Sequence, residues 1–299
     1  MVLCVRIECE KLYSYSLISS SDQDNNIGDV TVPLQNKQSA KQKTPTLKVM
    51  SMNCNSLISD KGHGLLSNLL LDLTPEILCI CESNLDNTIS DSAILPEHSG
   101  YEIINRKDNK LGAGGVLIAL TSDLIATPLK ELDTSCEVVW IKLEPLYIGP
   151  FYRTPSTDDP DVINKLHESI SKLTCKDTVL PNIILTDEFN VPDINWDNMS
   201  IRNNPNYSLQ LNNRMIDFVN ANYLSQLTDQ PTRHDNILDL TLTINPDTIS
   251  GMEILPGMSD HCTVLFDVNV TAKRQRKPDR YVYQYKQGDI GGVKDDMKE

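Results

Sequence analysis

The sequence predicts an α+β protein built as a four-layered α/β/β/α sandwich, in which two packed, mainly antiparallel sheets are flanked by helices. Three observations predict this fold. Predicted strands far outnumber predicted helices. Successive strands are separated by short turns that carry Gly or Asp, as antiparallel pairs require. The helices are amphipathic, so each can cover one face of a sheet. A doubly wound parallel sheet fits this pattern less well, because its strands need helical crossovers.

The first half of the chain is mostly strands. Regular structure is expected to begin with an alternating strand at 47–53, followed by a helix over 64–73 that Pro75 ends. An apolar strand at 76–81 then leads directly into Glu82. Further strands are expected at 101–105, 115–120, 138–143 and 146–152.

The second half holds the stretch on which the expected site centres. Apolar residues at 183–185 indicate a buried strand, which turns acidic in the run Asp-Glu-Phe-Asn. If the strand spacing continues, Glu188 and Asn190 point to one side, and Asp187 and Phe189 point to the other. The remaining elements are expected to be helices over 159–173 and 208–221 and strands at 237–243 and 263–270.

Charge and composition divide the chain into three parts. Residues 1–46 are expected to be a poorly ordered leader, 47–271 the folded domain, and 272–299 a basic, linker-like tail. The net charge is −14, and the domain holds 14 Lys and Arg against 31 Asp and Glu, whereas the tail holds 8 against 5. This balance excludes a general polyanion-binding protein, and the acid excess suits a divalent-metal site.

Cysteine usage and hydropathy indicate the cellular setting. The eight cysteines include no Cys-x-x-Cys pair, so structural zinc is not expected and a reducing, intracellular compartment fits best. The first 20 residues carry charges within their apolar stretch, so they are not expected to act as a signal peptide. No apolar run is long enough to cross a membrane, so we expect a soluble protein.

Polar or ionisable residues follow several of the predicted strands. Each one alone is ordinary, since strands leave the core and their ends meet water. Asp239 is more informative, because a carboxylate inside an apolar strand must be paired or must bind a ligand. His261 gains interest from its acidic neighbours, which make it a candidate base or phosphate contact. The full set is Asn53, Glu82, Tyr152, Glu188, Asn190, Asp239 and the triplet Ser259-Asp260-His261.

Six short motifs together resemble a known superfamily. They are Asn-Cys-Asn-Ser-Leu at 53–57, Glu-Ser-Asn-Leu at 82–85, Phe-Tyr-Arg-Thr-Pro at 151–155, Glu-Phe-Asn at 188–190, Leu-Asp-Leu at 238–240 and Ser-Asp-His at 259–261. Their order is that of the endonuclease/exonuclease/phosphatase superfamily. The chain most resembles the apurinic-endonuclease-like endonuclease domain of non-LTR retrotransposons, over roughly residues 47–270. The phrases at 191–196 and 230–233 are similar to the retrotransposon branch.

The resemblance implies a metal-dependent reaction on DNA. Glu82 would hold a divalent cation, Mg²⁺ or Mn²⁺, with Asn53 and Asp260 as ligands or close neighbours of the ligands. These are the hard oxygen donors that Mg²⁺ prefers. The reaction would be hydrolysis of a DNA phosphodiester that nicks one strand and leaves a free 3′ hydroxyl. DNA is then the expected partner, with no membrane and no obligate protein partner.

The resemblance also implies roles for five further residues. His261 would contact the scissile phosphate or transfer a proton, with its tautomer held by Asp239. Tyr152 and Asn190 would donate hydrogen bonds to the phosphate and its transition state. Glu188 stands at the position of the acid that aligns and deprotonates the attacking water. Action on chromosomal DNA would further require access to the nucleus.

The chain departs from the family pattern at residues 187–190, the stretch on which the expected site centres. The family reads Gly-Asp-Phe-Asn where this sequence has Asp187-Glu188-Phe189-Asn190. Glutamate moves the carboxylate by about 1.5 Å, and a misplacement of about 1 Å can cost about 10²-fold in rate. Asp187 adds a side chain where a glycine could provide a positive φ. We therefore expect activity to be reduced by at least about an order of magnitude, or lost.

Two alternative functions stay open. A phosphoesterase of the same fold that acts on a lipid or inositol phosphate would share the Asn, Glu and Asp-His motifs. A catalytically dead retrotransposon remnant would instead bind nucleic acid through Arg153, Arg233 and the basic tail, although the acidic domain argues against tight binding without metal. The tail resembles a linker to a reverse transcriptase, yet no polymerase motif is present.

Overall fold

The computed structural model describes residues 4–6, 46–109, 114–155, 159–174, 181–204, 208–275 and 281–283. The chain divides into two compact units, one made of Met1–Gln42 with Arg276–Glu299 and the other of Lys43–Gln275. In the first unit, β1 (Cys4–Arg6) pairs antiparallel with β17 (Tyr281–Tyr283). Most of the expected leader and tail lies outside the described residues. All other helices and strands belong to the second unit.

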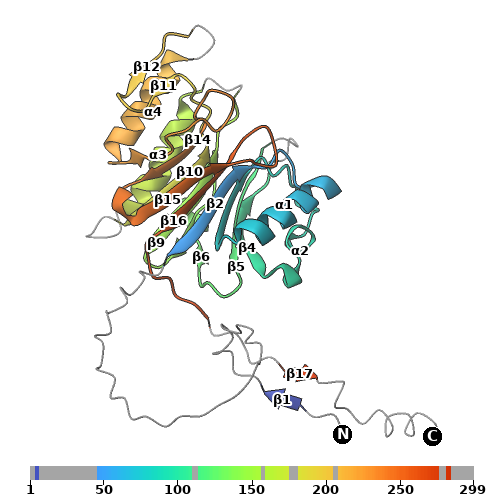
Figure 1. The fold of residues 1–299 in the computed structure, drawn as a ribbon. Helices are drawn as coiled ribbons and strands as arrows, with labels where there is room; N and C mark the ends of the chain where they lie inside the picture. The colour runs from blue at the N-terminus through green and yellow to red at the C-terminus, as the bar shows by residue number, and fades with distance from the viewer. Residues whose placement is uncertain are drawn as a thin grey trace, which may run out of the picture. The chain divides into compact units, whose positions relative to one another are not determined.

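One sheet of the second unit has six strands, in the order β15-β16-β2-β3-β5-β4. The helices α1 (Asp60–Leu73) and α2 (Asp91–Ile94) lie on the same side of this sheet (Figure 1). Its strands are β2 (Leu47–Asn53), β3 (Ile77–Cys81), β4 (Tyr101–Lys107), β5 (Val116–Thr121), β15 (Ile249–Leu255) and β16 (Thr263–Val268).

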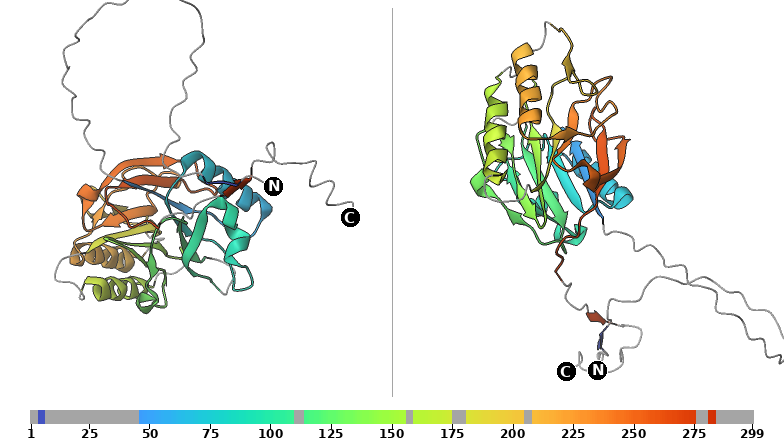
Figure 2. Two further views of the ribbon diagram at one scale, coloured as in Figure 1. Left: turned by 90° about the horizontal axis from the view of Figure 1, so that it is seen from below. Right: turned by 90° about the vertical axis from the view of Figure 1, so that its left-hand side faces the viewer.

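The other sheet has seven strands, in the order β13-β14-β10-β9-β8-β6, with β7 also paired to β9. The helices α3 (Asp161–Thr174) and α4 (Leu209–Ala221) pack side by side on its outer face (Figure 2). Its strands are β6 (Thr127–Pro128), β7 (Glu137–Val138), β8 (Ile141–Leu143), β9 (Leu146–Tyr152), β10 (Asn182–Glu188), β13 (Ser225–Gln226) and β14 (Asp239–Thr243). A separate pair is formed by β11 (Ile194–Asn195) and β12 (Ser200–Ile201), and short 3₁₀ turns span Glu97–Ser99, Lys130–Leu132 and Pro246–Thr248.

Three apolar cores lie between the four layers. The core between the sheets joins residues such as Val49 and Ile184. A second core packs α3 and α4 against the seven-stranded sheet, and a third packs α1 against residues such as Met50. Neighbouring residues of one strand enter different cores because side chains alternate across a sheet. The predicted four-layered α/β/β/α fold is thus confirmed.

Some elements differ from the expected ones. The helix expected over 64–73 begins four residues earlier, because the hydroxyl of Ser59 accepts a hydrogen bond from the Gly62 amide and caps it. The strand expected at 138–143 is two short strands, β7 and β8. The strand β15 was missed. It is a partly exposed edge strand with an irregular register and a Gly251 φ of +60°, so it lacks a clean apolar alternation.

The chain leaves the second unit at the end of the sheets where β2 and β3 begin. Arg274 forms ion pairs with Glu76 and Asp123, and the Gln275 amide donates to the Asp123 carbonyl. Ordered contacts therefore continue to Gln275, four residues beyond the expected domain boundary. Within the described ranges, every helix is too short or too polar to span a bilayer.

Candidate active site

Strand direction explains how distant motifs meet at one edge of the two sheets. The pairs β2/β3 and β9/β10 are parallel, so Asn53, Glu82, Tyr152 and Glu188 all lie at strand carboxyl ends. The strands β14 and β16 run antiparallel to β10 and β2, so they present their amino ends at this same edge. Asp239 and His261, at or just before those amino ends, are thereby brought to the same place.

A continuous set of contacts links four of the predicted residues. The Asn53 amide nitrogen donates to Glu188 Oε2 at 2.6 Å. The other carboxylate oxygen, Oε1, lies 3.4 Å from His261 Nε2, which is an ion-pair distance when the ring is protonated. His261 Nδ1 is 2.8 Å from Asp239 Oδ2. All four side chains are buried, so each contact is shielded from water.

Glu82 and Tyr152 form a second contact at this edge. Glu82 directly follows β3 and adopts a left-handed backbone with φ of +50°. The Tyr152 hydroxyl donates to Glu82 Oε1 at 2.6 Å. Burial raises the pKa of Tyr152, and the hydrogen bond to Glu82 and the nearby Glu188 raise it further. The phenol is therefore a stable hydrogen-bond donor at neutral pH.

The environment of the site shifts two further groups towards their protonated forms. Burial raises the pKa of Glu188 to about 7, and nearby Asp239 and Glu82 add to the rise, whereas His261 and Asn53 lower it. Burial alone would lower the pKa of His261, but its hydrogen bond and charge contact with Asp239 outweigh burial, so the pKa is raised. A carboxylate with a pKa near 7 has the acidity that suits a general base at neutral pH.

Asp187 is the least favourable residue in the site. It has a φ of +94°, a region that side-chain-bearing residues rarely adopt. Its carboxylate is fully buried, and neither oxygen has a hydrogen-bond partner of good geometry. Burial raises the pKa of Cys79 and Cys81, and the nearby Asp187 carboxylate raises it further. Both cysteines belong to the core between the sheets and Cys81 also contacts Glu188, so Asp187 lies on the side that Glu188 occupies. The expectation that Asp187 and Glu188 face opposite sides is therefore wrong, because the positive φ breaks the strand alternation.

We expect Asp187→Gly to stabilise the protein by about 2 kcal/mol at neutral pH, since backbone strain alone costs about 1–3 kcal/mol. Burial raises the pKa of Asp187 well above its ordinary value. The folded state therefore holds the proton more tightly than the unfolded state does. Asp187 makes its full contribution to stability below pH 3.8, the ordinary pKa of the group in the unfolded chain. That contribution falls as the pH rises above 3.8 towards the higher pKa of the folded state. The gain in stability from Asp187→Gly should therefore grow as the pH rises.

Thermal unfolding checks this, with an expected rise in melting temperature of about 4–8 °C at neutral pH. The control is Asp187→Asn, which removes the charge and keeps a side chain at the strained φ. It should flatten the pH dependence and stabilise less than glycine does. Equal melting temperatures for wild type and Asp187→Gly at about pH 5 and about pH 8 would contradict this reading.

Arg153 does not lie where the sequence led us to expect. It was predicted to contact nucleic acid, but its side chain is only 1% exposed. Its guanidinium donates to the carbonyls of Phe189, Asn190 and Thr154. The Asn190 side-chain amide in turn donates to the Arg153 carbonyl at 2.6 Å. That bond uses one of the two hydrogens of the Asn190 amide nitrogen, and both residues join β9 to the segment after β10.

Asp260 and Arg233 also pair with each other. Both Nε and Nη2 of Arg233 approach Asp260 Oδ2, at 2.9 and 2.6 Å. Both side chains are partly exposed, Asp260 to 50%. The structure therefore places Asp260 in a surface ion pair, whereas the sequence suggested a metal ligand. Arg233 keeps the accessibility expected of a residue that contacts nucleic acid.

Two supporting residues were given no role of their own from the sequence. The Ser259 hydroxyl donates to the Asn53 carbonyl and accepts from the His261 amide, which ties two motifs together. The Thr232 hydroxyl accepts from the amides of Leu238 and Asp239 and fixes the start of β14. Both lie within quoted motifs, but a short hydroxyl side chain carries no sign in sequence of which backbone it will hold.

The chemistry of the donors is compatible with a hard divalent cation. Glu82 is partly exposed at the edge, and Glu188 Oε1 and Asp239 Oδ1 are buried oxygens without hydrogen-bond partners. Among the described residues, no three His, Cys, Asp or Glu side chains are grouped as a metal site would require. Mg²⁺ commonly uses only one or two protein carboxylates, with water and substrate completing its coordination. Glu82 with nearby Asn53 fits that minimal arrangement.

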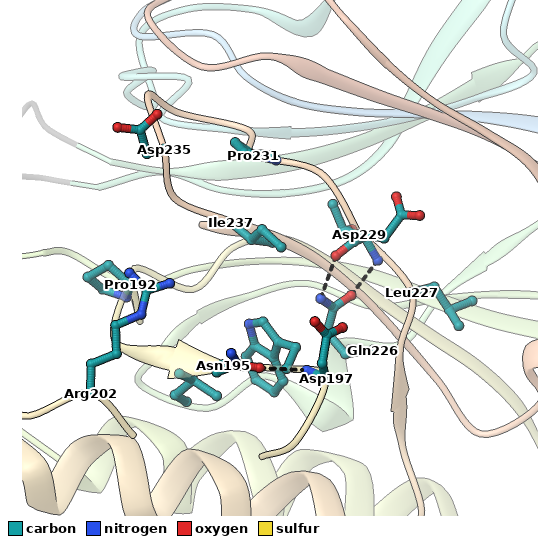
Figure 3. A pocket seen from close by; sticks show the side chains of 13 residues that line it. Pro192, Asn195, Asp197, Arg202, Gln226, Leu227, Asp229, Pro231, Asp235 and Ile237 are labelled. Atoms are coloured by element: carbon teal, nitrogen blue, oxygen red, sulfur yellow. Dashed lines mark hydrogen bonds between the residues drawn. The ribbon is translucent and has the colours of Figure 1, made fainter. Parts of the chain in front are cut away.

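A hollow lies beside the site rather than within it. Its volume is about 300 Å³, and it is lined on one side by the loop that follows Asn190 and on the other by the segment that leads to β14. Figure 3 shows Pro192, Asn195, Asp197 and Arg202 from the first segment, and Gln226, Leu227, Asp229, Pro231, Asp235 and Ile237 from the second. None of the candidate catalytic side chains lines it.

Comparisons with known proteins agree with this architecture. Residues 146–265 match the sequence family described as endonuclease-reverse transcriptase. Among curated proteins, none matches the sequence. An AP endonuclease from Archaeoglobus fulgidus has a similar structure, with a TM-score of 0.59 and 16% identity over 75% of this chain and 100% of its own.

Two other solved structures share the fold. A 3′ phosphatase, NExo, from Neisseria, bound to product DNA hairpin, gives a TM-score of 0.58 and 16% identity over 74% of this chain and 99% of its own. An AP endonuclease, LMAP, from Leishmania major gives a TM-score of 0.59 and 12% identity over 77% of this chain and 88% of its own. At these identities the likeness establishes the fold.

Proposed function

Since this chain has the endonuclease/exonuclease/phosphatase fold and resembles the retrotransposon-type nucleases within that superfamily, we propose that it is a metal-dependent DNA endonuclease. It hydrolyses a phosphodiester in one strand of duplex DNA and leaves a 3′ hydroxyl. The description endonuclease-reverse transcriptase supports the retrotransposon type. Activity on chromosomal DNA requires that the protein reach the nucleus.

One observation carries the proposal: Asn53, Glu188, His261 and Asp239, which come from four distant motifs, form a continuous chain of contacts. Glu82 and Tyr152 stand at the same strand edge and contact each other. Glu188 and Asp239 are buried and each keeps one carboxylate oxygen without a hydrogen-bond partner, which is costly, so a stability role does not explain them. A site that binds a cation and a phosphate would explain why these acids are placed there.

In this proposal each residue has a defined task. Glu188 accepts a proton from the attacking water, because its pKa of about 7 lets it do so at neutral pH. Asn53 holds the Glu188 carboxylate in place. His261, with Nδ1 fixed by Asp239, has Nε2 available for the scissile phosphate. The Tyr152 hydroxyl donates to the developing negative charge.

A divalent cation, Mg²⁺ or Mn²⁺, would be held by Glu82, with Asn53 beside it. When bound, it would stabilise the charge that develops on the phosphate oxygens. The geometry at this strand edge also supports the expectation that activity is reduced. The Glu188 carboxylate already lies 3.4 Å from His261 Nε2, so it competes with an incoming phosphate for that nitrogen. A shorter aspartate would leave more room.

The test is relaxation of supercoiled plasmid with Mg²⁺, with and without chelator, and with His261→Ala as the inactive reference. Nicking that needs both metal and His261 supports the proposal. Release of phosphate from a lipid or inositol phosphate, without nicking, would contradict it and favour a phosphoesterase of the same fold. DNA binding without any hydrolysis, in the wild type and in variants with the family residues restored, would indicate a remnant that only binds.

A further inference from the structure

Arg153 makes an unusual set of contacts beside the candidate active site. It directly follows β9 and is among the largest fully buried side chains of the protein. Burial of a guanidinium is strongly unfavourable unless its donors are satisfied. Here Nε donates to the Phe189 carbonyl at 2.8 Å, Nη2 to the Asn190 carbonyl and Nη1 to the Thr154 carbonyl at 3.2 Å. The guanidinium therefore donates to three backbone carbonyls within the protein.

These contacts converge on the segment that carries the proposed base. The Arg153 amide donates to the Glu188 carbonyl at 3.0 Å, beyond the last parallel pair of β9 and β10, Pro150 with Thr186. Together with the guanidinium bonds, Arg153 thus binds the carbonyls of three consecutive residues, 188, 189 and 190. Asn190 returns a hydrogen bond from its side chain to the Arg153 carbonyl.

The segment needs such support because its backbone is strained. Asp187 and Asn190 both have positive φ angles, of +94° and +53°, within four residues. Conformations of this kind persist only where the surroundings impose them. The Phe189 amide is bound to the Leu238 carbonyl, so the segment is fixed on one side by β14 and on the other by Arg153.

We infer that Arg153 is a positioning residue that holds residues 188–190 so that the Glu188 carboxylate faces the reacting phosphate. This rests on the proposed nuclease function. Arg153 does not touch the substrate. Lysine cannot replace it, because a single ammonium lacks the planar fork that reaches the Phe189 and Asn190 carbonyls together.

The first test separates positioning from phosphate binding. Arg153→Lys keeps the charge and should lower kcat by about 10- to 100-fold, since a shift of about 1 Å in a catalytic group costs about that much. The Kd for DNA, measured with Ca²⁺ in place of Mg²⁺, and its salt dependence should stay as in wild type. Arg153→Met should also lower kcat and leave the salt slope unchanged. The surface variant Arg274→Lys is the control and should retain wild-type kcat.

A phosphate-binding role predicts the opposite pattern. Loss of one phosphate contact in Arg153→Met would make the slope of log Kd against log salt shallower by about 0.9 and would raise KM. A shallower slope in Arg153→Met, or an unchanged kcat in folded Arg153→Lys, would overturn the inference.

A second measurement needs no variant and no activity. In the wild type, the Arg153 Nε proton, which donates to the Phe189 carbonyl, should exchange slowly with water. Fast exchange would overturn the inference even if both variants fail to fold. A wild type that neither binds nor cuts DNA would defeat the proposed function, whereas slow exchange in the free protein would still support Arg153 as the support of residues 188–190.

Discussion

Replacing His261 by alanine is expected to lower the rate of plasmid nicking by about 10²- to 10⁴-fold, the range that a positioned proton-transfer group supplies. The ring is buried, Asp239 holds its Nδ1 at 2.8 Å, and its Nε2 is the ring nitrogen left to meet a phosphate. Alanine removes this nitrogen and also leaves the Asp239 carboxylate buried without its partner. Loss of the ring nitrogen acts on the transition state, so kcat should fall more than KM rises.

The matched control is His167→Ala. His167 lies on α3, where its Nδ1 contacts the Asn222 amide, away from the strand edge that carries the site. This variant should nick at close to the wild-type rate. Because the wild-type rate is itself expected to be low, the comparison is repeated in the Glu188→Asp background. A His261→Ala protein that nicks within about threefold of its parent would exclude His261 from the mechanism.

The double substitution Asp187→Gly with Glu188→Asp is expected to raise the nicking rate by at least about tenfold. Two separate causes contribute. Aspartate withdraws the carboxylate from His261 Nε2, where Glu188 now lies at 3.4 Å, and so makes room for substrate. Glycine accepts the φ of +94° without strain and removes a buried carboxyl group near Asp239. The segment can then take up the geometry that the reaction needs.

The single variants separate the two causes. Glu188→Asp alone should account for most of the gain in kcat, because it changes the carboxylate that meets the water. Asp187→Gly alone should mainly raise the melting temperature. If the double variant is no faster than wild type, then the two departures from the family pattern do not limit activity. In that case the reason for any low activity lies elsewhere in the chain.

The fold was predictable because its signals are local. Apolar alternation in segments such as 47–53, and the amphipathic helix over 159–173, each indicate one element without reference to the rest of the chain. The edge strand β15 escaped because its residues are half-exposed and interrupted by Gly251. The order of the motifs predicted that Glu82, Tyr152 and His261 lie at one strand edge. The distances between side chains there could come only from the three-dimensional arrangement.

The roles of the charged residues were harder to predict from sequence. An arginine in a Tyr-Arg-Thr-Pro motif is as compatible with a surface contact as with a buried one, and only the carbonyls around Arg153 decide between them. Similarly, nothing local to Asp260 indicates that Arg233, 27 residues away, will bind its carboxylate. The positive φ at Asp187 was suggested by comparison with a glycine and could not have been deduced from the aspartate itself.

The ion pairs of Arg274 have a practical consequence. They secure the chain near Glu76, at the end of β3 opposite Glu82. A seven-residue strand such as β2 spans about 20 Å, so an attachment made just after Gln275 would start roughly that far from the catalytic edge. A fluorescent label, an affinity handle or a bead coupled there would leave a long duplex free to approach the opposite side. Single-molecule tests of the proposed cleavage could therefore tether this protein just after Gln275.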